Sequence, residues 1–186
     1  MSDFIISVRL FLLSIIVCSA AYPAVMLGFA SVVAPEARQG NLIRSEDGTI
    51  VGSRLIAQKF TRPEYFWSRP SACDYNASAT AGSNLSPTNT KLTDRAKEII
   101  GQLKPGEGQL VPADLVTASG GGMDPHITLS AAVFQIPRVA AARNLSADRV
   151  EELMREHTDS PTLAAFGGEQ IVNVLELNLA LDAAAR

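Results

Sequence analysis

The sequence predicts an α+β domain that follows a single N-terminal transmembrane helix. Two observations support this fold class. Residues 10–35 contain no charged side chain, and this run exceeds the roughly 20 apolar residues that a helix needs to cross a bilayer. Residues 36–186 contain segments of helical and of strand periodicity without regular β-α-β repeats, which is typical of an α+β arrangement.

Three segments follow from this pattern: a short N-terminal tail at 1–9, a transmembrane helix at 10–35 and a soluble α+β domain at 36–186. A cleaved signal peptide is the alternative for the apolar run, but the apolar core of such peptides is only about 7–15 residues long. A lipoprotein anchor at Cys18 is a second alternative, and bulky Val17 before it argues against this. We therefore expect a retained helix.

Small residues recur every four positions in the apolar run, at Ala20, Ala24 and Gly28. This spacing places them on one helical face, where small side chains allow another membrane helix to approach closely. The alternative is that small residues are simply common in membrane helices. Pro23 is expected to bend the helix locally, because it lacks a backbone N–H and its ring crowds the preceding turn.

In the soluble domain, Asp47-Gly48 lies between two short apolar runs and predicts a hairpin turn. Residues 60–76 combine aromatics, arginines and prolines, and they predict an ordered, extended stretch without regular structure. A helix is expected from Thr88 to Leu103, because apolar residues recur on one face there.

The C-terminal part predicts two further helices and a strand. The first helix is expected at 130–144, where Pro137 should kink or divide it. Ser146 is a suitable N-cap for the next helix, which should run to about His157. Residues 171–174 read as a strand, and helical periodicity follows directly.

The glycine run is the first candidate for a binding site, formed by Ser119, Gly120, Gly121 and Gly122. It follows the stretch 111–118, which is interpreted as a short strand, and glycine-rich turns after strands can direct N–H groups at an anion. No Gly-x-x-x-x-Gly-Lys-Ser/Thr motif is present to supply a phosphate-binding lysine. A plain tight turn is the favoured alternative.

A hydrolase is the alternative function. Ser119, Asp124 and His126 supply the residue types of a catalytic triad, which would make the chain a membrane-anchored hydrolase using Ser119 and His126. However, the serine lacks the Gly-x-Ser-x-Gly context, and the three residues lie close together in the sequence.

A partner-facing patch is the second candidate site, at Tyr65, Phe66, Trp67 and Arg69. Aromatic residues and arginine are enriched among the anchors of protein interfaces. The alternative is that these rings fill the core of the domain.

Charge and cysteine content exclude other classes. A net charge of −3 without long basic blocks argues against nucleic-acid binding. The two cysteines fall in different segments, at Cys18 and Cys73, so no disulfide is expected. With only two histidines, widely separated, no metal site is expected either.

The chain as a whole resembles the C subunit of the bacterial Kdp-type potassium-transporting ATPase, the KdpC family. The resemblance runs almost end to end and includes the single N-terminal span. It rests on "GSRLIAQKFTRPEYFWSRPSACDYN", "GSNLSPTN", "VPADLVTASGGGMDPHI", "QIPRVAAARNL" and "VNVLELNLALD" in this order and spacing.

The resemblance implies a non-transporting accessory subunit rather than an enzyme. Its implied partners are a channel-like potassium-binding subunit, a P-type ATPase subunit that carries the catalysis, a small membrane peptide and the lipid bilayer. The family is proposed to act as a catalytic chaperone that raises the ATP affinity of the P-type subunit. The resemblance implies no tightly bound cofactor. ATP would be bound by the partner subunit, and the glycine run from Ser119 to Gly122 would contact that nucleotide.

Two points qualify this nucleotide contact. The family often has another serine near Gly121 or Gly122 and leucine at Met123, so the run departs from the pattern. The resemblance also implies a bacterial inner-membrane protein with a cytoplasmic N-terminus and a periplasmic domain. A bilayer core about 30 Å thick would then separate the run from cytoplasmic ATP, which favours a structural role and an allosteric effect on ATP affinity.

Ion transport by this chain alone is excluded. Residues 10–35 hold no ionisable side chain that coordinates or relays an ion. One span also cannot enclose a selectivity filter.

Overall fold

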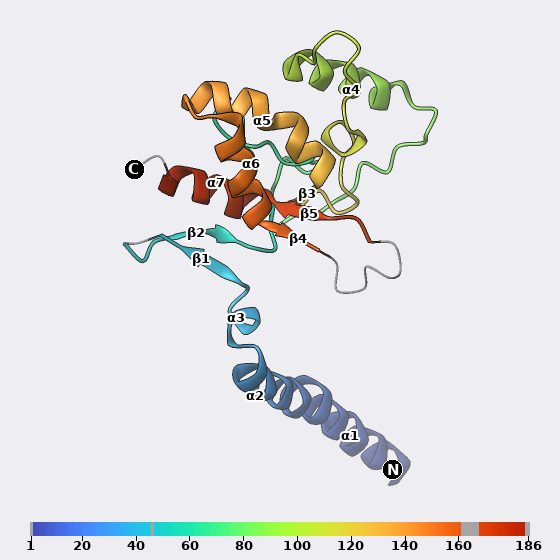
Figure 1. The fold of residues 1–186 in the computed structure, drawn as a ribbon. Helices are drawn as coiled ribbons and strands as arrows, with labels where there is room; N and C mark the ends of the chain where they lie inside the picture. The colour runs from blue at the N-terminus through green and yellow to red at the C-terminus, as the bar shows by residue number, and fades with distance from the viewer. Residues whose placement is uncertain (1, 46, 161–167, 185–186) are drawn as a thin grey trace. The chain divides into compact units, whose positions relative to one another are not determined.

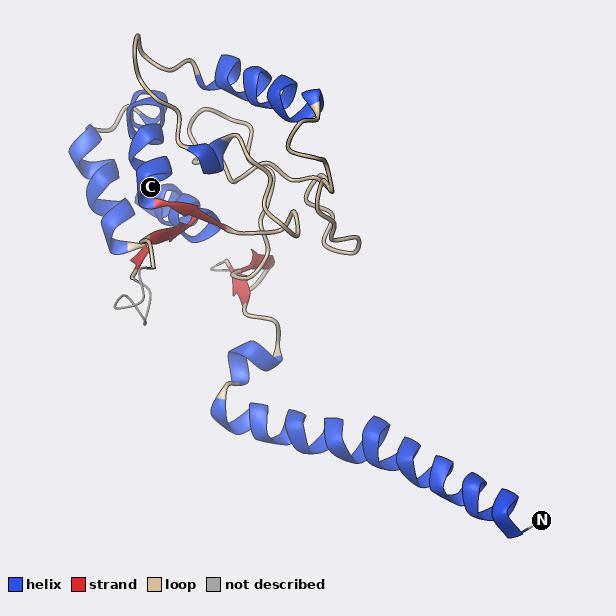
Figure 2. Ribbon diagram, turned by 90° about the vertical axis from the view of Figure 1, so that its right-hand side faces the viewer, coloured by secondary structure: helices blue, strands red, loops and turns tan. Residues whose placement is uncertain are grey.

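The computed structural model describes residues 2–45, 47–160 and 168–184. The chain forms two compact units, residues 1–42 and residues 43–186, and each is described by itself. Their helices and strands are drawn in Figures 1 and 2. The expected single helix followed by an α+β domain is confirmed.

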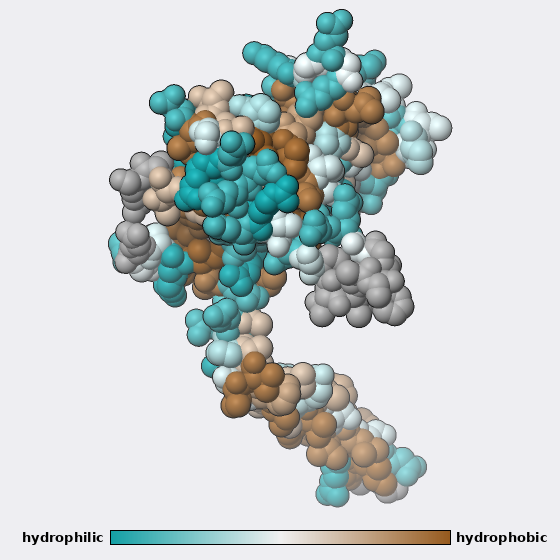
Figure 3. All heavy atoms as spheres, viewed as in Figure 1, coloured by the Kyte–Doolittle hydropathy of each residue, from teal (hydrophilic) through white to brown (hydrophobic). Residues whose placement is uncertain are grey.

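The N-terminal unit is one long helix followed by a short one. It comprises α1 (Ser2–Ile15), a π-helical turn (Ile16–Ala21), α2 (Tyr22–Val33) and the single turn α3 (Pro35–Arg38). The stretch Asp3–Val33 is long and apolar enough to cross a membrane, and its apolar surface is shown in Figure 3. The helix already begins at Ser2, so residues 2–9 are helical as well.

A π-helical turn lies beside Pro23, where the sequence predicts a bend. Tyr22 donates its N–H to the carbonyl oxygen of Val17, five residues back. Pro23 has no N–H to donate, and its ring crowds the preceding turn. The wider turn Ile16–Ala21 lies directly before the proline, as a single π turn within an otherwise α-helical stretch.

The second unit begins with the predicted hairpin. Strands β1 (Leu42–Arg44) and β2 (Ile50–Ser53) form a two-stranded sheet. Gly48 adopts φ +83° in the turn, which glycine accepts without a steric cost. Asp47 Oδ1 accepts hydrogen bonds from the N–H of Thr49, at 3.0 Å, and from the hydroxyl of Ser45.

A three-stranded antiparallel sheet lies at the centre of the domain, with β5 (Ile171–Asn173) between β3 (His126–Thr128) and β4 (Thr158–Asp159). Ile127 pairs with Val172, and both are buried. The strand predicted at 171–174 is thus confirmed, and α7 (Val174–Ala184) follows it at once.

Helices α5 (Leu129–Arg143) and α6 (Ala147–Glu156) complete the core together with α7. Helix α5 packs on α6 and on the sheet, and α6 packs on α7. Ser146 caps α6 as predicted, because its Oγ accepts the N–H of Arg149 at 3.2 Å. Pro137 lies inside α5 and is exposed, and α5 continues through it instead of dividing.

Helix α4 (Thr90–Leu103) matches the predicted helix, but it starts two residues later than expected. Asn89 is its N-cap, with the side-chain oxygen accepting the N–H of Lys91. The strand interpretation of 111–118 is wrong: a 3₁₀ turn spans Ala113–Leu115. Asp114 belongs to this turn, where Oδ2 accepts the N–H of Thr128 at 2.8 Å.

Candidate functional site

The glycine run forms a tight turn that closes on itself. The N–H of Gly122 donates to the carbonyl of Ser119 at 3.2 Å, and the N–H of Ser119 donates to the carbonyl of Pro70 at 3.3 Å. Gly122 adopts φ +72°, a conformation that side-chain-bearing residues rarely adopt. The tight-turn interpretation therefore describes the local geometry.

Neighbouring loops touch this turn so closely that side chains do not fit at two glycines. A Cβ at Gly122 would lie 2.7 Å from Cys73 Sγ and 2.8 Å from the carbonyl oxygen of Ala81. A Cβ at Gly82 would lie 2.6 Å from the carbonyl oxygen of Gly120. The loop at 81–82 thus contacts the turn at 119–122 through backbone atoms, and the loop at 71–73 contacts it through the side chains of Ser71 and Cys73.

The four predicted nucleotide-binding residues differ in access. Ser119 is buried, and its Oγ accepts the N–H of Asp124 at 3.4 Å. Gly120 and Gly121 are exposed, and a Cβ at either would meet nothing within 4 Å. Any ligand of this turn would therefore meet backbone groups of Gly120 and Gly121 rather than the serine hydroxyl.

Asp124 joins the turn to β3 and to residues 60–76, which we call the aromatic segment. Its Oδ2 lies 3.2 Å from Arg69 Nη1. Its Oδ1 accepts the N–H of His126 at 3.0 Å and lies 3.4 Å from His126 Nδ1. Partial burial acts to raise the pKa of Asp124, but the hydrogen bonds from His126 and the charge of Arg69 outweigh it and lower that pKa.

The residues of the hydrolase alternative lie near one another without forming a relay. Ser119 bonds to the backbone of Asp124, and in the described part of the chain no hydrogen bond joins Ser119 to His126. A triad needs the base within reach of the nucleophile. The polar groups here fix the path of the loop into β3.

The aromatic segment is irregular, as predicted, and two buried amides hold its backbone. Asn178 of α7 accepts the N–H of Phe66 at 2.8 Å and donates to its carbonyl at 3.0 Å. Gln135 of α5 does the same for Trp67, at 2.8 and 3.2 Å. These side chains satisfy backbone groups that a neighbouring strand would otherwise satisfy. Sequence reasoning missed both, although polar residues within otherwise apolar helices were a visible signal.

Charged side chains hold the same segment at its start. Arg138 donates from Nη1 to the carbonyls of Pro63 and Tyr65, at 2.6 and 2.9 Å. Asp182 accepts the hydroxyl of Tyr65 at 3.0 Å and pairs with Arg143 at 2.7 Å. Helices α5 and α7 thus fix a stretch that has no regular structure of its own.

The predicted partner patch divides between core and surface. Phe66 has no exposed surface and belongs to the core, so the core interpretation is right for this residue and it offers no contact to a partner. Tyr65, Trp67 and Arg69 are partly exposed and remain the accessible members of the predicted patch.

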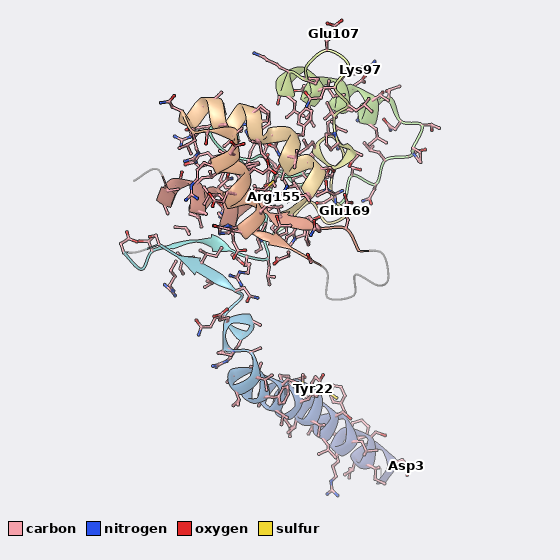
Figure 4. All side chains as sticks on the ribbon, in the orientation of Figure 1. Asp3, Tyr22, Lys97, Glu107, Arg155 and Glu169 are labelled. Atoms are coloured by element: carbon pink, nitrogen blue, oxygen red, sulfur yellow. The ribbon has the colours of Figure 1, made fainter. Side chains whose placement is uncertain are left out.

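The small-residue face predicted on the apolar helix is exposed. Ala20, Ala24 and Gly28 are exposed, and a Cβ at Gly28 would meet nothing within 4 Å. Figure 4 places the side chains of Asp3 and Tyr22 on the same long helix.

The fold and these loops define a class: a small α+β domain joined in sequence to an apolar helix of membrane-spanning length. The family model described as "KdpC: K+-transporting ATPase, c chain" matches residues 4–183. The chain belongs to this KdpC family.

Curated relatives agree with this assignment. A potassium-transporting ATPase KdpC subunit of Parvibaculum lavamentivorans is 46% identical over 182 residues, covering 98% of this chain and 97% of the relative. The KdpC subunit of Ralstonia nicotianae is 48% identical, covering 89% and 83%. That of Serratia proteamaculans is 45% identical, covering 95% and 96%.

Proposed function

We propose that this chain is the non-transporting accessory subunit of an ATP-driven potassium uptake complex, which it assembles and stabilises. The observation that carries the proposal is the match to the K+-transporting ATPase c-chain family over residues 4–183, which includes both the apolar helix and the domain. Its partners would be a channel-like potassium-binding subunit, a P-type ATPase subunit that carries the catalysis, and a small membrane peptide.

The proposal includes an effect on the ATP affinity of the P-type subunit. We place the N-terminus in the cytoplasm and the domain outside it, so a bilayer core of about 30 Å lies between the glycine turn and the nucleotide. The effect is then allosteric and needs a difference in binding between two states of the pump. Burial of the Ser119 hydroxyl removes that group from any direct phosphate contact, which leaves only backbone groups of Gly120 and Gly121 for one.

Sidedness can be tested at Cys73, which is partly exposed, whereas Cys18 lies in the apolar helix. A Cys18→Ala chain in intact cells is treated with a membrane-impermeant maleimide, and a permeant maleimide serves as the control for reactivity. Labelling of intact cells is expected. Labelling only after permeabilisation would place the turn beside cytoplasmic ATP and overturn the allosteric version.

The membrane helix would contribute to assembly through its small-residue face. Ala24→Leu adds bulk to that face, and Ala30→Leu adds the same bulk about 120° around the helix from Ala24. The complex is purified from membranes through a tag on the P-type subunit. We expect Ala24→Leu to reduce the recovered chain more than Ala30→Leu does, and equal recovery would contradict a role of this face in assembly.

A further inference from the structure

A hollow of about 500 Å³ lies between the C-terminal end of α4, helix α5 and the aromatic segment. Its volume falls within the range of roughly 300–1,000 Å³ that is usual for small-molecule sites. Apolar side chains form much of its lining, among them Trp67, Leu103 and Phe134. We call it the Trp67 hollow.

The charged groups of the Trp67 hollow are both positive. Lys104 and Arg138 line it, and no carboxylate does. The ion pairs formed within residues 2–45, 47–160 and 168–184 include neither of these cations. Glu107 lies on the loop after α4 but is not part of the lining, and Figure 4 shows it at the outer tip of that loop.

Arg138 is a partly buried cation that forms no ion pair with any carboxylate of the described residues. Its Nη1 and Nη2 donate to neutral oxygens of Pro63, Tyr65 and Gln135, and its guanidinium stacks 4.1 Å from the ring centroid of Trp67. Burial lowers the pKa of Arg138 to about 10, which leaves it protonated at neutral pH. An anion beside it would offset the cost of burying the charge.

We propose that the Trp67 hollow binds an amphiphilic carboxylate, with its apolar chain or ring against Trp67, Leu103 and Phe134 and its carboxylate toward Lys104 and Arg138. The apolar lining favours a hydrophobic body, because removing apolar surface from water drives such binding. The two cations favour a negative head over a neutral or positive one. This site does not depend on the proposed subunit function.

The single tryptophan of the chain makes the site directly observable. The full-length protein in discs of zwitterionic lipid is titrated with octanoate, and Trp67 emission is recorded. Octylammonium, which has a chain of the same length and the opposite charge, is the matched ligand control. We expect a saturable change with octanoate that weakens with added salt, and no saturable change with octylammonium.

Two variants of Lys104, just beyond the end of α4, and one control variant on α4 test whether octanoate binds in the Trp67 hollow. Lys104 is exposed, so replacing it should leave the fold intact. We expect octanoate affinity to fall about threefold in Lys104→Gln, which is within the range of exposed ion pairs. It should fall about tenfold in Lys104→Glu, because the new carboxylate also repels the ligand. Lys97→Glu is the control, because Lys97 is exposed on α4 and does not line the hollow.

Either of two results overturns the proposal. One is an equal response to octanoate and octylammonium, which would mean partition of the chain into lipid or unselective apolar contact. The other is an octanoate affinity that changes equally in Lys104→Glu and Lys97→Glu, which would mean that only the overall charge of α4 and its surroundings matters.

Discussion

The amide of Gln135 is the contact whose removal tests the fold of the aromatic segment most sharply. Gln135 is 1% exposed. It accepts the N–H of Trp67 at 2.8 Å, donates to the carbonyl of Trp67 at 3.2 Å and accepts from Arg138 at 2.6 Å. Gln135→Leu keeps the approximate size of the side chain but removes every one of these bonds.

The expected cost follows from the groups left without partners. Each buried donor or acceptor left unsatisfied costs about 1–3 kcal/mol. Trp67 is only partly buried, so water can reach some of the groups that lose a partner. We therefore expect Gln135→Leu to lower the free energy of unfolding by about 2–4 kcal/mol. Gln102→Leu is the matched control, since Gln102 is exposed and its one side-chain hydrogen bond to a described residue is with Glu98, at 3.5 Å. The effect of Gln102→Leu on the free energy of unfolding should be within about 0.5 kcal/mol.

Urea unfolding of the full chain in detergent measures the free energy of unfolding of both variants. Trp67 emission follows the transition without a label, because Trp67 is the only tryptophan. Equal stability of Gln135→Leu and Gln102→Leu would refute the claim that the buried amide holds the aromatic segment in place.

Three further predictions concern the glycine turn. Gly122→Ala should lower the free energy of unfolding by about 2 kcal/mol or more, because φ is +72° and the new Cβ would contact backbone and Cys73 Sγ. Gly121→Ala is the control and should change the free energy of unfolding little, because nothing lies within 4 Å of its Cβ. Equal effects of the two variants in urea unfolding would contradict the packed turn. Asp124 has a lowered pKa, so its contribution to stability is present above its unfolded pKa of about 3.9 and is lost as pH falls through its lower folded pKa. Acid titration of unfolding should therefore show a smaller loss in Asp124→Asn, and an unchanged profile would contradict this. The hydrogen bond with Ser71, followed by one with the backbone of Ala81, lowers the pKa of Cys73. Maleimide should therefore react with Cys73 faster at neutral pH than it reacts with free cysteine. Ser71→Ala should slow that reaction, and an unchanged rate would exclude the hydrogen bond as the cause.

Local patterns in the sequence predicted several elements correctly. Ser146 before an amphipathic stretch predicts the start of α6, and Asp47-Gly48 between apolar runs predicts the first hairpin. The change from strand to helix after residues 171–173 was also visible from periodicity. These features depend on contacts between residues close in sequence, which pattern reasoning can assess.

The sequence alone could not predict how the irregular segment folds. Phe66 and Trp67 obtain their backbone partners from Asn178 and Gln135, which lie 112 and 68 positions away along the chain. No local pattern specifies such pairing. The strand predicted at 111–118 is wrong for a related reason. The turn found there is held by a contact distant in sequence, in which Asp114 accepts the N–H of Thr128, 14 positions along the chain.

The candidate sites were predicted only in part. The glycine run was recognised, but burial of Ser119 depends on the loop at Pro70 packing beside it. The Trp67 hollow was not anticipated, since its cations and rings come from α5, the end of α4 and the aromatic segment. Only the folded chain brings Lys104 and Arg138 to one cavity.

The most direct test of the accessory-subunit account is to purify the potassium-transporting complex with and without this chain and to measure assembly and the KM for ATP. The account predicts that the chain copurifies with the P-type and channel-like subunits. It also predicts that, without the chain, recovery of the complex falls and the KM for ATP of any residual complex rises. A complex that assembles fully and keeps the same KM for ATP without this chain would contradict the account.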